Sequence, residues 1–182
     1  KASPVASKPT AKLVTDTSLE HFDTTIPKEQ PWLFWAYYGD PHAPYIRHKS
    51  IPDLGHTMPD IYDEEIAYTD LHIGRLLDGL EARGRLKNTI ILITSDHGER
   101  LDKKHDRHLY HGASLHDSEI HVPLIVHVPY LSPVRVKKPV GNIDLFPTLL
   151  TLTRTSKPGE LHLQGSTLIP FLKGEDPAHP PV

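Results

Sequence analysis

The alternation of apolar and polar stretches predicts several buried strands. Three apolar runs, 32–38, 89–94 and 122–128, are short and bounded by Pro, Gly, Asp or Asn. Runs of this kind, apolar on both faces, are typical of strands covered on both sides of a sheet. The third run contains Pro123, which fits best at the start of a strand.

Helical periodicity appears between these strands. From Tyr62 to Leu80, apolar residues recur at spacings of three and four, which predicts an amphipathic helix with this stripe in the core. Acidic residues lie in its first turn, and Gly84 is a natural stop. A second helix is predicted after Asp144 as N-cap, with Pro147 tolerated in its first turn.

Together these elements predict an α/β fold with a mostly parallel central sheet flanked by helices, because strands buried on both faces require a helical layer on each side. Residues 1–30 are rich in Pro, Ser, Thr and Lys without a sustained period, and are expected to form a linker or a loosely packed connection. The α/β domain is expected over 31–174, and 175–182 as a tail.

Composition excludes several classes of function. The net charge of −3 gives no basic excess for nucleic-acid binding, and no apolar run is long enough for a membrane span. The chain has no cysteine, so it offers no disulfide, thiolate metal site or cysteine nucleophile. It has 14 histidines, which can act as metal ligands or proton-transfer groups.

The strongest candidate site follows the strand 89–94. Asp96 and His97 follow it after a single residue, and ligands of α/β sheets bind beyond the carboxyl ends of strands. Gly98 permits a sharp turn that would let both side chains face one divalent cation. The alternative is an Asp that caps the turn beside an exposed His97.

Other histidines divide by their surroundings. His42, in DPHAPY, could bind an anionic oxygen or transfer a proton. His111, in YHGAS, precedes a glycine that allows close approach of the backbone, although a lone histidine in a loop is more often not catalytic. His105 and His108 lie among charged residues and are interpreted as solvated. His127 is interpreted as a structural histidine of the third strand.

The combined motifs resemble the carboxyl-terminal half of the sulfatase family in the alkaline phosphatase superfamily. The stretches that carry the resemblance are FWAYYGDPHAPY, the helix leading to NTIILITSDHGE, YHGASLHDSEIHVPLIV, NIDLFPTLLTL and LQGSTLIPFLKG. They cover the chain from Trp32 to Gly174. The resemblance implies an alkaline-phosphatase/sulfatase-like fold that is incomplete without its amino-terminal half.

The resemblance also implies residue roles. Asp96 and His97 match the pair that ligates the active-site metal; Ca²⁺ is the first expectation, with Mg²⁺, Mn²⁺ and Zn²⁺ as alternatives. His111 matches the position that contacts the ester and helps protonate the leaving group. His42 matches the histidine that hydrogen-bonds the transferred group, so both histidines are expected to be catalytic and substrate-binding.

The chain departs from the family in one respect. Sulfatases carry two further acidic metal ligands and a Cys/Ser-x-Pro/Ala-x-Arg motif, whose Cys or Ser becomes formylglycine, near the amino terminus, and the chain contains no such motif. We therefore expect the nucleophile upstream, in an amino-terminal half that partners this chain. The parent protein is expected to be a sulfuric ester hydrolase acting on a small-molecule or carbohydrate sulfate ester, and this chain alone to be inactive.

Two alternatives stay open. The same motifs resemble phosphodiester or phosphonate hydrolases and phosphoryl-group transferases of the superfamily, which would change the substrate. A non-catalytic sulfatase-like module would keep the fold and lose the metal site. The resemblance favours a periplasmic or extracellular location, which the residues themselves leave undetermined.

Overall fold

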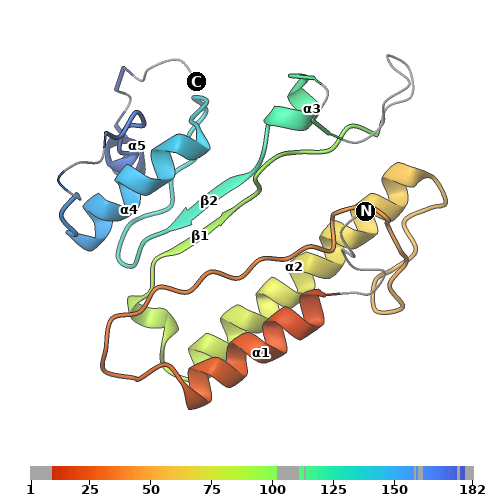
Figure 1. The fold of residues 1–182 in the computed structure, drawn as a ribbon, viewed down its shortest axis with the longest axis horizontal. Helices are drawn as coiled ribbons and strands as arrows, with labels where there is room; N and C mark the ends of the chain where they lie inside the picture. The colour runs from red at the N-terminus through yellow and green to blue at the C-terminus, as the bar shows by residue number, and fades with distance from the viewer. Residues whose placement is uncertain are drawn as a thin grey trace. The chain divides into compact units, whose positions relative to one another are not determined.

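The computed structural model describes residues 10–101, 111–112, 114–157, 159, 162–175 and 177–178. They divide into two compact units. The first lies within Lys1–Thr89 and Glu99–Ser114, and the second within Ile90–Gly98 and Leu115–Val182. Long helices build the first unit, whereas the second combines a small sheet with short helices (Figure 1).

The first unit is organised around helix α2, Met58–Ala82, which the apolar periodicity predicted. Its start is fixed by a reciprocal cap, in which the Thr57 N–H donates to the Asp60 carboxylate and the Asp60 N–H donates to the Thr57 hydroxyl. Gly84 follows its end with φ of 67°, a left-handed conformation that favours glycine. The predicted helix and its stop are confirmed, and η1, Leu86–Asn88, comes next.

The buried face of α2 differs from the predicted stripe. Tyr68, His72, Leu76 and Leu80 are buried, whereas Ile66 is 43% exposed. The prediction was therefore wrong at Ile66. The reason is that the neighbouring elements of this unit pack on the face of α2 that carries these four buried residues. Polar side chains therefore share the buried stripe with apolar ones.

Helix α1, Ala11–Thr24, is a second difference, because a linker or loose connection was expected over 1–30. It lies beside α2 (Figure 1). Its buried residues recur at three and four: Ala11, Thr15, Ser18 and Phe22. The Thr15 hydroxyl donates to the His72 carbonyl at 2.9 Å, so a buried polar group is satisfied across the two helices.

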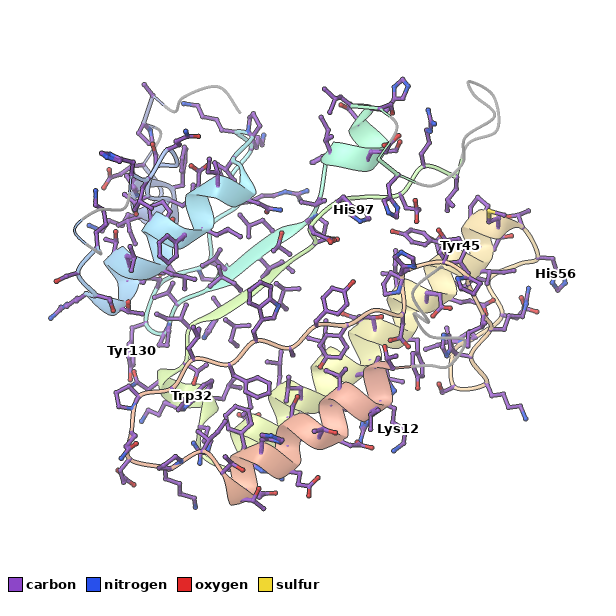
Figure 2. All side chains as sticks on the ribbon, in the orientation of Figure 1. Lys12, Trp32, Tyr45, His56, His97 and Tyr130 are labelled. Atoms are coloured by element: carbon purple, nitrogen blue, oxygen red, sulfur yellow. The ribbon has the colours of Figure 1, made fainter. Side chains whose placement is uncertain are left out.

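The segment 32–38 was predicted to be a strand, but it forms no strand pairing within the described residues. Its side chains still alternate, since Leu33 and Trp35 are 89% and 87% exposed while Trp32 and Phe34 pack on the core. That core consists of Phe22, Leu76 and Leu80. Figure 2 labels Trp32, whose ring lies edge-on to Phe22 at 4.9 Å.

The second unit contains strands β1, Ile91–Thr94, and β2, Leu124–His127. They pair antiparallel, with Ile91 opposite His127 and Thr94 opposite Leu124. The mostly parallel arrangement is therefore not seen in the described strand pair. A parallel pair needs a long crossover, usually a helix packed on the sheet, and the described part of this connection holds only the short helix α3, Asp117–Ile120.

The rest of the second unit contains one buried carboxylate that links two parts of the chain by hydrogen bonds. It comprises η2, Asn142–Asp144, α4, Leu145–Thr153, and α5, Ile169–Leu172. Asp144 is the N-cap residue of α4, as predicted, although its side chain makes no capping hydrogen bond to that helix. Its buried carboxylate accepts hydrogen bonds from the Gly141 N–H at 2.9 Å and the Ser166 N–H at 2.7 Å. No described helix combines the length and apolarity that crossing a membrane requires.

Candidate functional site

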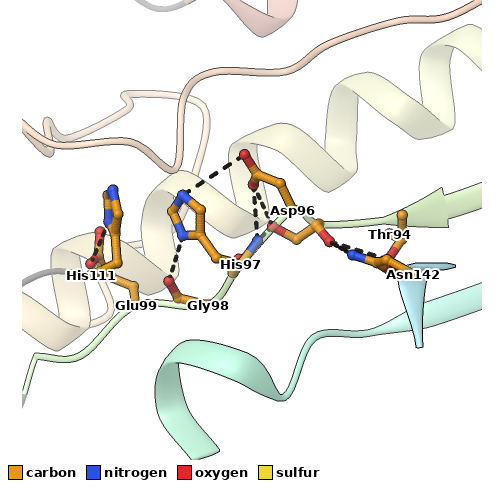
Figure 3. A network of polar contacts seen from close by, with 8 residues as sticks. Thr94, Asp96, His97, Gly98, Glu99, His111 and Asn142 are labelled. Carbon is orange, nitrogen blue, oxygen red and sulfur yellow. Dashed lines mark hydrogen bonds and ion pairs between the residues drawn. The ribbon is translucent and has the colours of Figure 1, made fainter. Parts of the chain in front are cut away.

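Asp96 and His97 lie just beyond the carboxyl end of β1 in the second unit, as the sequence predicted. The Asp96 Oδ1 accepts the His97 backbone N–H at 3.0 Å, and the Asp96 Oδ2 lies 3.8 Å from the His97 Nε2 (Figure 3). The Asp96 side chain is 71% exposed. Two ligands bound to one cation at about 2.0–2.6 Å lie roughly 3–4 Å apart, so the separation fits a shared metal ion.

The contact made by Nδ1 of His97 also supports a role for this residue as a metal ligand. His97 Nδ1 is 2.8 Å from the Gly98 carbonyl oxygen, which can only accept a hydrogen bond (Figure 3). In a neutral imidazole the proton is then on Nδ1, and the lone pair is on Nε2, the nitrogen that lies 3.8 Å from the Asp96 Oδ2. Metal-ligating histidines usually donate their second ring N–H to a carbonyl or carboxylate, so the donor set fits a divalent cation.

Gly98 has a different role from the predicted one. It was expected to permit a sharp turn, but it is not among the glycines with positive φ. Its N–H donates to the Glu119 carbonyl at 2.8 Å, and a Cβ at this position would collide with the Ser118 carbonyl oxygen. Glycine is therefore needed because the strand end packs closely against α3, which fixes the backbone beside His97.

Sequence reasoning missed a support for the strand end. The Asn142 side-chain amide donates to the Ser95 carbonyl at 2.9 Å, and its oxygen accepts from the Thr94 hydroxyl at 3.3 Å (Figure 3). Asn142 comes from a distant part of the chain, where it begins the NIDLFPT stretch. It links the two residues immediately before Asp96 to η2, so the metal-ligand candidates rest on a braced backbone.

His42 and His111 belong to the first unit, and the structure brings them together. Their ring centroids are 5.8 Å apart with an interplanar angle of 68°. The Nδ1 of His42 contacts the Ala43 carbonyl at 2.7 Å, and the Nδ1 of His111 contacts the Glu99 carboxylate at 3.1 Å. Each ring has its Nδ1 engaged by an acceptor, so a neutral ring carries its proton on Nδ1 and its lone pair on Nε2.

Three other histidines discussed from the sequence are not part of the pair formed by His42 and His111. His127, interpreted as a structural histidine of the strand, is the last residue of β2 and is exposed. His105 and His108, which were interpreted as solvated, lie outside the described residues.

A buried polar cluster beside the His42 loop was also missed. Asp40, His48 and Glu65 each place a potential ligand atom within 4.8 Å of the others. The His48 Nε2 lies 2.6 Å from one Glu65 oxygen, and the Ile46 N–H donates to the other at 2.6 Å. Burial raises the pKa of the Glu65 carboxyl.

Protein donors already satisfy this cluster. Both Asp40 oxygens accept hydrogen bonds from Thr10, one from the N–H at 2.9 Å and one from the hydroxyl. Because both carboxylates have partners without a cation, the cluster is explained as an anchor. Asp40 and His48 lie on either side of His42 in the chain, so the anchor fixes the loop that presents it.

A family model described as Sulfatase matches residues 7–155. The chain is 27% identical over 184 residues to the "Uncharacterized sulfatase YdeN" of Escherichia coli, a match that covers 92% of this chain and 31% of that protein. The chain spans about a third or less of the length of the first curated relatives that it matches.

Solved structures agree with this match. The crystal structure of Ps i-CgsB is similar with a TM-score of 0.76 at 22% identity, covering 91% of this chain and 39% of that one. The phosphonate monoester hydrolase of Agrobacterium radiobacter is similar with a TM-score of 0.56 at 33% identity, covering 65% and 23%. These likenesses confirm the α/β, alkaline-phosphatase-like fold class. Because the family model covers most of its length, the chain belongs to the sulfatase family.

Proposed function

We propose that this chain is the carboxyl-terminal part of a divalent-metal-dependent sulfuric ester hydrolase. Its substrate is a sulfate ester of a small molecule or a carbohydrate. The observation that carries the proposal is the donor pair after β1, where the Asp96 Oδ2 and the His97 Nε2 are 3.8 Å apart and the second His97 nitrogen is engaged by a backbone carbonyl. Family membership supports the choice of reaction.

Asp96 and His97 would hold the metal ion, with Ca²⁺ proposed first because carboxylate ligands favour hard cations. When bound, such an ion neutralises the charge of the ester's sulfuryl oxygens and activates the attacking nucleophile. Two ligands are fewer than any of these ions requires, so further donors and the nucleophile, proposed as formylglycine, come from an amino-terminal part of the same protein.

His111 and His42 handle the ester. His111, as an imidazolium, donates the Nε2 proton to the leaving oxygen as the S–O bond to the alcohol breaks. His42, also as an imidazolium, donates a hydrogen bond from Nε2 to a non-bridging sulfuryl oxygen, which stabilises the charge that builds up there. The His48–Glu65 contact and the Asp40 hydrogen bonds keep the His42 loop in place while the substrate binds.

Hydrolysis of phosphonate or phosphate esters is the second candidate. The likeness to a phosphonate monoester hydrolase at 33% identity favours it, although that likeness covers only 23% of that chain. Sulfate and phosphonate monoesters share tetrahedral geometry and anionic oxygens. The two esters differ in the atom that the nucleophile attacks, which is sulfur in one and phosphorus in the other. The nucleophile itself is proposed to lie outside this chain.

Parallel turnover measurements on the full-length protein containing this chain test the proposal. We expect 4-nitrophenyl sulfate to be hydrolysed with a kcat/KM at least about tenfold higher than that of 4-nitrophenyl phenylphosphonate, which corresponds to roughly 1.4 kcal/mol of transition-state preference. The 182-residue chain alone serves as the inactive control. A reversed preference would support the second candidate, and hydrolysis of neither by metal-loaded protein would indicate a non-catalytic module.

A further inference from the structure

The Glu99 carboxylate is buried between two side chains that sequence motifs do not connect. Its Oε2 accepts a hydrogen bond from the Tyr45 hydroxyl at 2.7 Å, and its Oε1 lies 3.1 Å from the His111 Nδ1. The Glu99 side chain is only 4% exposed, compared with 29% for His111. Figure 3 shows the contact between the two side chains. All three residues belong to the first unit, so the arrangement does not depend on how the two units are placed.

Because Glu99 is buried, its hydrogen bonds to Tyr45 and His111 matter more than they would at the surface. A carboxylate removed from water is costly unless each oxygen has a hydrogen-bond donor, and here one donor is a phenol and the other an imidazole. Aromatic side chains form part of the surroundings, because the Tyr45 and Tyr62 rings are 5.3 Å apart. Burial, followed by the negative charge of Glu99, raises the pKa of the Tyr62 hydroxyl. The surroundings of the Glu99 carboxylate therefore screen its negative charge only weakly.

The chemistry of the contact fixes the His111 tautomer. An ionised carboxylate only accepts hydrogen bonds, so the proton of a neutral His111 ring is on Nδ1 and the lone pair is on Nε2. When the ring gains a second proton, that proton is on Nε2 and can be donated. A carboxylate that holds Nδ1 in serine hydrolases sets ring orientation in the same way.

We propose that Glu99 is a positioning residue for His111 and that the Tyr45 hydroxyl holds Glu99 in turn. The proposal rests on the proposed function, in which the His111 Nε2 meets the leaving oxygen. Glu99 touches neither substrate nor metal; it keeps the imidazole in the orientation and tautomer that allow proton donation.

The first test needs no turnover. In the full-length protein labelled with ¹⁵N-histidine, the neutral His111 ring, assigned from its loss in His111→Ala, should be protonated at Nδ1. In Glu99→Gln the Tyr45 hydroxyl donates to the amide oxygen, which turns the amide NH₂ toward Nδ1 and should move the proton to Nε2. A wild-type ring protonated at Nε2, or a tautomer unchanged in Glu99→Gln, would overturn the proposal.

The second test uses the full-length protein and two leaving groups. Glu99→Gln should lower kcat by about 100-fold on an alkyl sulfate and by no more than about threefold on 4-nitrophenyl sulfate, whose phenolate leaves without a proton, with KM little changed. The exposed Glu81→Gln is the matched control and should behave as wild type. Tyr45→Phe should show the same pattern with a smaller loss.

The outcomes separate the two proposals. Equal loss on both substrates, or no loss on either, would overturn the positioning role while leaving the sulfatase activity in place. If the wild-type protein hydrolyses no sulfate ester, the proposed function fails, and the tautomer measurement alone decides whether Glu99 positions His111.

Discussion

Asp96→Asn is expected to lower the kcat for 4-nitrophenyl sulfate by about 10³-fold in the full-length protein, or roughly 4 kcal/mol of transition-state stabilisation. The substitution keeps the shape of the side chain and removes the negative charge that binds the cation. The metal content, measured by mass spectrometry after dialysis, should fall with the activity. Fold stability should change little, because the side chain is 71% exposed and its contacts are with its own neighbours.

The matched control is Asp78→Asn, which makes the same chemical change at an exposed position of α2. It should retain wild-type turnover, metal content and thermal midpoint. Full metal content in Asp96→Asn would contradict the assignment of Asp96 as a ligand, even if the activity fell.

His111→Ala is expected to lower the kcat for an alkyl sulfate by about 10²–10³-fold, because the alkoxide leaving group then departs without its proton donor. Metal content should stay at the wild-type level, since His111 is not proposed as a ligand. Steady-state kinetics with the metal-loaded full-length protein measure the effect.

His21→Ala provides the comparison for His111→Ala, because it removes an exposed imidazole from α1. Its kinetics should match those of the wild type. Near-normal turnover in His111→Ala would rule out proton donation by this residue and would leave His42 as the remaining candidate of the pair.

Local signals were enough to predict some of the fold. The long helix α2 has a sustained apolar period, an acidic first turn and Gly84 after its end, so sequence and structure agree there. Helix α1 was missed because Thr15 and Ser18 lie on its buried face, and their hydroxyls are satisfied by backbone carbonyls. A buried face that is half polar carries only a weak apolar period for sequence reasoning to find.

The candidate site shows the same division. Asp96 and His97 could be placed at a strand end because an apolar run ends shortly before them. The contact of Glu99 with His111 and Tyr45 depends on tertiary packing, as do the brace from Asn142 and the anchor formed by His48 and Glu65. Residues far apart in sequence leave no spacing pattern, so these supports became visible only in three dimensions.

The central claim is that a divalent metal ion makes the full-length protein a sulfate-ester hydrolase. The most direct measurement is the release of inorganic sulfate from 4-nitrophenyl sulfate before chelation, after chelation and dialysis, and after a divalent metal is added back. We predict that chelation lowers the rate by at least about 100-fold and that Ca²⁺, or failing that Mg²⁺, Mn²⁺ or Zn²⁺, restores it. Sulfate release that continues unchanged in the stripped protein would contradict the account.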